Sequence, residues 1–265
     1  MEKGQRRVIK SHFVFVHGLG HGAWCWYKVI TTLISLGYKA TALDLAASGV
    51  HYKESEEVKS LSDYVEPLMH VVELLPPDDR LILVGHGMGG LAISLAMDKF
   101  PKKIAAAAFV AAYMPGPDFP FSHIIQQSNQ GLDFLKDNKY KFDNGTDKPP
   151  TAVYFGSNFL SSKMYQYSRA EDMILASLLM RHTPMFHDPE VLKEAELTKE
   201  KYGSIPRVYI MCSQDLSMKA DVQRWMIEKN PPQDVKVILG SDHMVMFSKT
   251  QEFCSRLMEI AEKYH

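Results

Sequence analysis

Short apolar runs alternate with stretches of helical apolar spacing through most of the chain. The runs are rich in β-branched and aromatic residues, such as FVFV at 13–16 and LILV at 81–84, which is typical of buried parallel strands. The predicted strands span residues 12–17, 39–45, 80–84, 104–112, 207–212 and 235–239. The predicted helices span residues 24–36, 61–75, 91–100, 219–228 and 250–264. This alternation predicts an α/β fold with a mostly parallel sheet and helices on both faces.

The alternation stops between residues 114 and 185. Prolines come close together at its start, and short apolar helical pieces follow at 159–167 and 170–180. A segment of this length is too long for a plain loop, so we predict a lid inserted at the carboxyl ends of the strands. The core then has a first part, 1–113, and a second part, 186–265. Among the lid aromatics, we expect Phe155 and Phe159 to line an apolar pocket.

A strained Gly-rich turn follows the apolar run at 81–84, and a helical pattern begins directly after it. Strand, sharp turn and helix in this order are typical of the nucleophile elbow of hydrolases, Gly-x-Ser-x-Gly. Here the turn reads Gly-His-Gly-Met-Gly, and Gly87 occupies the nucleophile position, which therefore has no hydroxyl. A plain turn or a phosphate-binding loop would be the alternatives. The glycine spacing does not fit the dinucleotide-binding pattern.

An acid and a histidine follow the elbow in the order that hydrolases use. Asp215 comes just after the strand at 207–212, and His243 just after the strand at 235–239. In such a pair the carboxylate fixes the tautomer of the imidazole, which moves the proton. Asp242 is an alternative acid, although we expect it to bond to backbone in its own turn.

Two backbone N–H groups are predicted to form an oxyanion hole. One belongs to Met88, directly after the elbow position, and the other to Leu19, in the loop after the first strand. His86 and His17 flank this place, and we assign them structural or pocket-lining roles.

Composition excludes several other classes of function. The chain has 265 residues, of which 46% are hydrophobic, and this is enough for one sizeable core. A net charge of -1 disfavours nucleic acid or an anionic membrane as a partner. The polar first ten residues carry no signal sequence, so we expect a cytoplasmic protein. No apolar stretch of the sequence is long enough to span a membrane. The three cysteines form neither a disulfide framework nor a metal site, and we expect no metal, nucleotide or flavin cofactor.

Several segments together resemble the plant methylesterase and hydroxynitrile lyase family of α/β-hydrolases. They are HGLGHGAW at 17–24, ATALDLAASG at 40–49, the elbow, KYGS at 201–204 and SDHM at 241–244. Within that family the chain is most similar to methylketone synthases, through residues 24–28, 89–94 and 226–232. The resemblance implies His-dependent decarboxylation of 3-keto acids, because those enzymes carry alanine in place of the nucleophilic serine.

Departures from the family leave other activities open. Hydroxynitrile lyases carry threonine at the position of Gly18 and lysine at that of Met244, so cyanohydrin cleavage is disfavoured. Methylketone synthases also carry threonine at the first position and a less acidic partner for the histidine. Alternatives to a decarboxylase are therefore a methyl ester hydrolase, with Gly87 a natural or an engineered replacement of serine, and a non-catalytic binding protein.

The expected ligand is a small apolar carboxylic acid, a keto acid or a methyl ester. A homodimer is left open. The residues expected to bind the substrate are Gly18, His86, Phe155, Phe159 and Met244.

Overall fold

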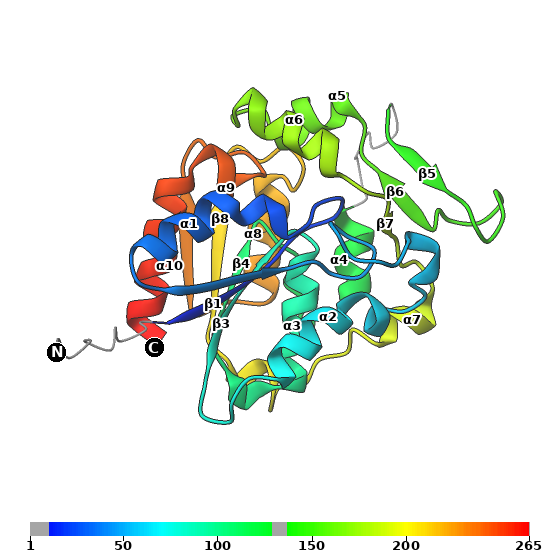
Figure 1. The fold of residues 1–265 in the computed structure, drawn as a ribbon. Helices are drawn as coiled ribbons and strands as arrows, with labels where there is room; N and C mark the ends of the chain where they lie inside the picture. The colour runs from blue at the N-terminus through cyan, green and yellow to red at the C-terminus, as the bar shows by residue number, and fades with distance from the viewer. Residues whose placement is uncertain (1–10, 129–136, 265) are drawn as a thin grey trace.

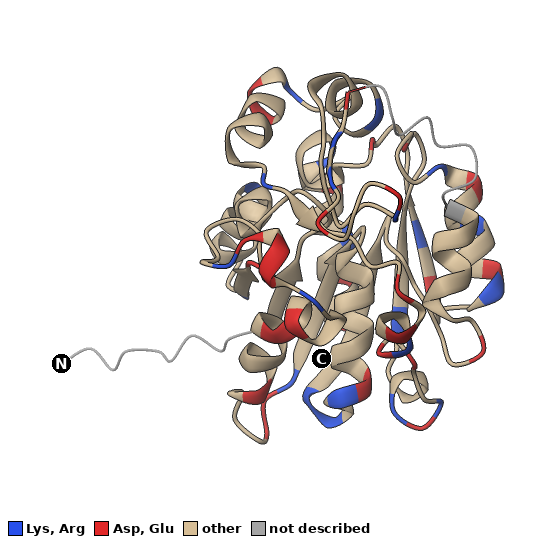
Figure 2. Ribbon diagram, turned by 90° about the vertical axis from the view of Figure 1, so that its right-hand side faces the viewer, with Lys and Arg blue, Asp and Glu red and all other residues tan. Residues whose placement is uncertain are grey.

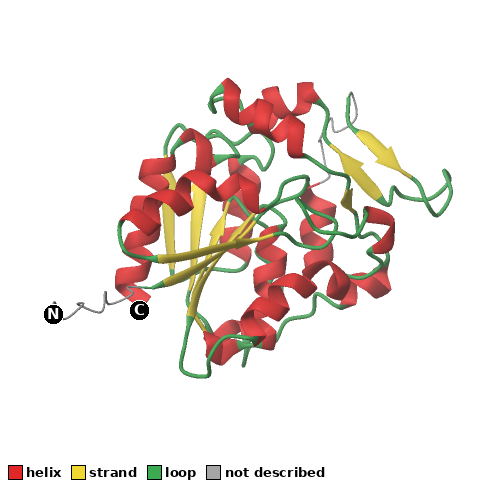
Figure 3. Cartoon of the chain, viewed as in Figure 1, coloured by secondary structure: helices red, strands yellow, loops and turns green. Residues whose placement is uncertain are grey.

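A six-stranded parallel sheet forms the centre of the computed structural model, which describes residues 11–128 and 137–264 (Figures 1 and 3). The strand order is β2-β1-β3-β4-β8-β9. The strands are β1 His12–Val16, β2 Lys39–Leu43, β3 Leu81–His86, β4 Ile104–Val110, β8 Arg207–Cys212 and β9 Asp234–Ile238. Each predicted strand is present, with ends displaced by at most two residues. The N-terminal segment in which no signal sequence was found lies outside the described residues.

Helices cover both faces of this sheet, as the alternation predicted (Figure 1). Side chains of β1 alternate between two apolar cores: Val14 and Val16 face one, and Phe13 and Phe15 the other. The first core packs against α2 Leu61–Glu73, α3 Gly89–Lys99 and α8 Ala220–Lys229. The second core packs against α1 Tyr27–Ser35, α9 Val245–Ser248 and α10 Thr250–Tyr264.

Residues 137–184 of the segment predicted as a lid form a layer above the sheet, whereas residues 121–128 pack with the core helices (Figure 1). This layer carries a small antiparallel sheet of order β5-β6-β7, which the sequence did not predict because its strands are only two or three residues long. The helical piece predicted at 159–167 instead spans residues 157–164. The lid elements are β5 Lys139–Lys141, β6 Ala152–Tyr154, α5 Ser157–Phe159, the π-helical turn η4 Leu160–Met164, α6 Ala170–Leu179 and β7 Thr183–Pro184, and the helix beside the core is α4 Phe121–Ser128.

Short connecting elements complete the chain. The predicted helix at 24–36 is divided into the 3₁₀ turn η1 Ala23–Trp26 and α1. The remaining short elements are η2 Ser55–Glu57, η3 Pro101–Lys103, α7 Pro189–Lys193 and η5 Tyr202–Ser204. None of the helices in the described ranges is both long and apolar enough to cross a bilayer. Acidic and basic residues are interspersed over the helices and turns in Figure 2.

All strands of the large sheet run parallel, so their carboxyl ends meet at one edge. The loops that follow β1, β3, β8 and β9 carry Leu19, Gly87, Asp215 and His243 respectively. Ligand sites of open parallel sheets form at this edge.

Candidate active site

The turn between β3 and α3 has the sharp backbone of a nucleophile elbow. Gly87 adopts a φ of +54°, in the left-handed region where a residue with a β-carbon is strained. The turn also passes close to the β1 loop, because a β-carbon on Gly89 would lie 2.5 Å from the carbonyl oxygen of Val16. The elbow is thus intact in its backbone although residue 87 has no side chain.

His243 faces the position where a nucleophile would lie. A β-carbon built on Gly87 would lie 3.6 Å from Nε2 of His243 and 3.5 Å from the α-carbon of Gly18. Both are ordinary van der Waals separations, so this place has room for a small side chain.

Asp215 and His243 form a buried hydrogen-bonded pair. Nδ1 of His243 lies 2.7 Å from Oδ2 of Asp215, and the other carboxylate oxygen accepts the N–H groups of Ser217 and Met218, each at 2.8 Å. An ionised carboxylate oxygen can only accept, so Nδ1 of His243 donates. The Nε2 atom is therefore the one directed at residue 87, the arrangement in which an imidazole can accept and return a proton.

Asp242 has a different role from the one predicted. Its Oδ2 accepts hydrogen bonds from the N–H of Tyr167 and the hydroxyl of Ser168, both at 2.9 Å. These partners belong to the lid and not to the turn around Asp242. Burial raises the pKa of this carboxyl group. Asp242 thus fastens the lid next to His243, and the hydrogen bond to His243 comes from Asp215.

Leu19 and Met88 both line the cavity that contains His243, as an oxyanion hole requires. In the described part of the chain neither N–H donates a hydrogen bond to the protein. Met88 also precedes the first turn of α3, where the helix dipole favours negative charge. The two N–H groups are therefore available to a developing oxyanion.

His86 supports the site from below and does not line the cavity. Its ring lies 4.4 Å from that of His243, and its Nε2 donates to the His243 carbonyl oxygen at 2.9 Å. Burial lowers the pKa of His86 well below its usual range, so the ring is neutral. Its Nδ1 has no partner among the described residues and would lie 3.0 Å from a β-carbon on Gly18.

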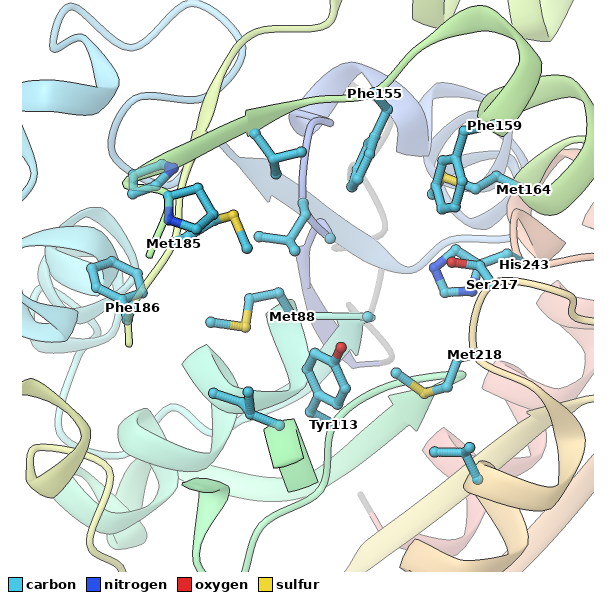
Figure 4. Close-up of a pocket in the computed structure, with 18 of the residues that line it drawn as sticks. Met88, Tyr113, Phe155, Phe159, Met164, Met185, Phe186, Ser217, Met218 and His243 are labelled. Carbon is cyan, nitrogen blue, oxygen red and sulfur yellow. The ribbon is translucent and has the colours of Figure 1, made fainter. Parts of the chain in front are cut away.

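A mostly apolar cavity of about 420 Å³ opens above the pair (Figure 4). The predicted residues Gly18, Phe155 and Phe159 line it. Met244 does not, because its side chain is fully buried in the core under α1 and α10. Residues that the sequence did not single out also line the cavity, namely Tyr113, Met185, Phe186, Ser217 and Met218. Met185 and Phe186 lie at the side remote from His243 (Figure 4).

The described residues contain no group of three or more His, Cys, Asp or Glu that could hold a metal ion. The three cysteines are buried free thiols, and burial raises the pKa of each. Proton transfer by His243 and hydrogen bonds from the two N–H groups are the chemistry that this arrangement provides.

Comparison with known proteins shows the family. Residues 13–256 match the alpha/beta hydrolase family. The chain belongs to this family. It is 52% identical to methyl jasmonate esterase 1 of Vitis vinifera over the full length of both chains. Plant methylesterases are thus close relatives of this α/β-hydrolase.

Solved structures agree with this assignment. Tomato methylketone synthase I complexed with 2-tridecanone has 42% identity and a TM-score of 0.93, covering 97% of this chain and 100% of the other. Polyneuridine aldehyde esterase has 35% identity and a TM-score of 0.88, covering 95% and 99%. The resemblance predicted from the segments is confirmed at the level of the family and of the α/β-hydrolase fold. The α/β-hydrolase described here therefore has both esterases and a methylketone synthase among its relatives.

Proposed function

We propose that this α/β-hydrolase decarboxylates a 3-keto acid to the methyl ketone, with His243 carrying the proton. One observation supports this most directly. The His243–Asp215 pair and the N–H groups of Leu19 and Met88 are all in place around an elbow that has no hydroxyl, and we call these groups the cradle. Nε2 of His243 faces a place that holds no attacking atom, since residue 87 is glycine. Decarboxylation of a 3-keto acid needs no covalent intermediate, so the remaining groups are sufficient for it.

The proposed reaction uses His243, Asp215 and the two N–H groups. The carboxyl group of the bound acid gives its proton to Nε2 of His243, and Asp215 stabilises the resulting imidazolium. The bond between the carboxyl carbon and the α-carbon then breaks, and CO₂ leaves. Its electron pair moves to the ketone oxygen, forming an enolate held by the N–H groups of Leu19 and Met88. His243 returns the proton to the α-carbon, so the acid yields one ketone and one CO₂.

The cavity and a related structure support an apolar substrate. Apolar residues, among them four phenylalanines and four methionines, form most of the cavity wall (Figure 4). A volume of about 420 Å³ falls within the range of small-molecule sites. Tomato methylketone synthase I has been crystallised with 2-tridecanone and, as a variant, with beta-ketoheptanoate. The proposed substrate is therefore a 3-keto acid with an alkyl chain.

Ketone and CO₂ release from beta-ketoheptanoate and longer 3-keto acids would test this proposal, after subtraction of the spontaneous reaction. We expect turnover by the wild type and its loss in His243→Ala. His70→Ala is the matched control, because His70 is exposed on α2, away from the cavity lining. Equal ketone formation by His243→Ala and wild type, or none above background by the wild type, would contradict the proposal.

Hydrolysis of a methyl ester is the second candidate. It is favoured by the 52% identity with methyl jasmonate esterase 1. In this reaction a water bound beside Gly87 would attack the ester after giving its proton to His243. The test is acid release from methyl jasmonate and other methyl esters by the wild type, with His243→Ala and His70→Ala alongside. Acid release without ketone formation would favour this candidate over the decarboxylase.

A further inference from the structure

The oxyanion loop after β1 is held by two buried histidines. Nδ1 of His17 lies 2.8 Å from the carbonyl oxygen of Gly18, and Nδ1 of His21 lies 2.8 Å from that of Leu19. Burial lowers the pKa of both imidazoles, that of His21 to about 3, so both are neutral near pH 7. A carbonyl oxygen can only accept, so the single N–H of each ring is on Nδ1.

The second nitrogen of each ring shows what fixes it. Nε2 of His17 accepts the N–H of Leu45 at 3.1 Å, which belongs to the core. Nε2 of His21 lies 2.6 Å from the hydroxyl of Tyr165, which must donate because Nε2 carries no proton. Tyr165 is 3% exposed and follows η4 in the lid. The carbonyl oxygen of Gly18 is thus bonded to a ring that the core fixes. The carbonyl oxygen of Leu19 is bonded to a ring that the lid fixes.

The lid also holds the N–H of the same peptide group. The N–H of Gly20 donates to Oγ1 of Thr183 in β7 at 2.7 Å, and Thr183 is 1% exposed. Phe155 and Met180 pack directly over this point, since a β-carbon on Gly20 would lie 3.0 Å from one side chain and 3.3 Å from the other. The peptide group between Leu19 and Gly20 is therefore held at its oxygen through Tyr165 and at its N–H by Thr183.

These contacts determine the direction of the Leu19 N–H. That N–H shares a planar trans peptide with the Gly18 oxygen, so it points opposite to an atom that His17 fixes. The other end of this peptide plane is the α-carbon of Leu19, which moves with the peptide group held by the lid. We propose that Thr183 and Tyr165 are positioning residues through which the lid aims the Leu19 N–H at the oxyanion. This inference rests on the proposed function, in which Leu19 stabilises the enolate.

Steady-state kinetics with a 3-keto acid test the effect on the reaction. We expect Thr183→Val to lower kcat roughly tenfold while KM stays within about twofold, because the donor is displaced but the apolar cavity is kept. Thr183→Ser retains the hydroxyl and should restore kcat, and Tyr165→Phe should resemble Thr183→Val. Thr151→Val is the matched control, because among the residues that the structure describes the Thr151 hydroxyl bonds to Lys141 and Asp143, both in the lid.

Hydrogen exchange provides a readout that needs no turnover. We expect the amides of residues 17–22 to exchange faster in Thr183→Val and Tyr165→Phe than in the wild type, Thr183→Ser and Thr151→Val. Unchanged exchange would overturn the inference. So would a kcat that Thr183→Val leaves unchanged in an active protein, or a kcat loss that Thr183→Ser shares. If the wild type forms no ketone, the proposed function fails, and the exchange result alone decides whether the lid orders this loop.

Discussion

Gly87→Ser would add a hydroxyl at the one point where the cradle lacks an attacking atom. The new β-carbon would lie 3.6 Å from Nε2 of His243, so the oxygen bonded to it can reach the hydrogen-bond range of about 2.6–3.2 Å. Asp215 already holds His243 with Nε2 toward this place. The variant would therefore complete a Ser-His-Asp triad without movement of either partner.

Two magnitudes follow from the geometry. A residue with a β-carbon at a φ of +54° costs about 1–2 kcal/mol of folding stability. At roughly 2–4 °C per kcal/mol for proteins near this size, the melting temperature falls by a few degrees. Loss of a serine nucleophile from a complete triad lowers kcat by about 10⁶-fold. We therefore expect its restoration to raise methyl ester hydrolysis by at least about 10³-fold, allowing for incomplete alignment.

Gly87→Ala is the matched control, because it adds the β-carbon and the same backbone strain without the oxygen. Both variants should lose similar stability in a thermal melt. Free acid released from methyl jasmonate should rise only in Gly87→Ser, and methanol should appear with a burst that corresponds to formation of the acyl-enzyme. Equal, slow hydrolysis by both variants would show that His243 does not activate a hydroxyl at this position and would refute the reasoning.

Three further predictions concern the groups around residue 87. Asp215→Asn should lower kcat by about 10²–10⁴-fold with little change in KM, because an amide can stabilise the wrong tautomer of His243; steady-state kinetics with a 3-keto acid check this, and an unchanged kcat would contradict it. Gly18→Ala should destabilise the fold by about 1–3 kcal/mol, since its β-carbon would lie 3.0 Å from a buried imidazole. Urea unfolding measures this against Gly203→Ala, where a β-carbon meets nothing nearer than 3.9 Å. Burial lowers the pKa of His21 to about 3 in the folded state. Below pH 6.5 the unfolded state therefore binds more protons than the folded state, and the free energy of unfolding decreases as the pH decreases. Urea unfolding should show a loss of about 2 kcal/mol from this residue between pH 7 and pH 5, and a His21→Gln variant with an equally steep fall would count against it.

The strands and the main site residues could be predicted because parallel strands impose a simple rule. The strands of the large sheet are five to seven residues long, the central ones are apolar runs, and all of them end at one edge of the sheet. Residues that follow these ends therefore meet although they are far apart in sequence. Asp215 and His243 are separated by 28 positions and still form a hydrogen bond.

The lid and much of the cavity wall could not be predicted in the same way. Strands of two or three residues, such as β7, are too short to show a period, so the small sheet has no signal in the sequence. Tyr113 and Phe186 are single residues in irregular segments, and nothing in their spacing shows that they face a cavity. His86 and Met244 are adjacent in sequence to site residues, but their side chains are buried outside the cavity lining.

The structure explains how the elbow residue can be glycine while the rest of the cradle is kept. The hydrogen bonds that hold Asp215 come from Ser217 and Met218, and those that hold the Leu19 loop come from His17, His21 and Thr183. None of these bonds involves a side chain at position 87. Replacing serine there removes strain at a positive φ and leaves every other partner in place. The reacting group and the groups that stabilise charge are therefore held independently, so this fold can change its chemistry at one residue without being rebuilt.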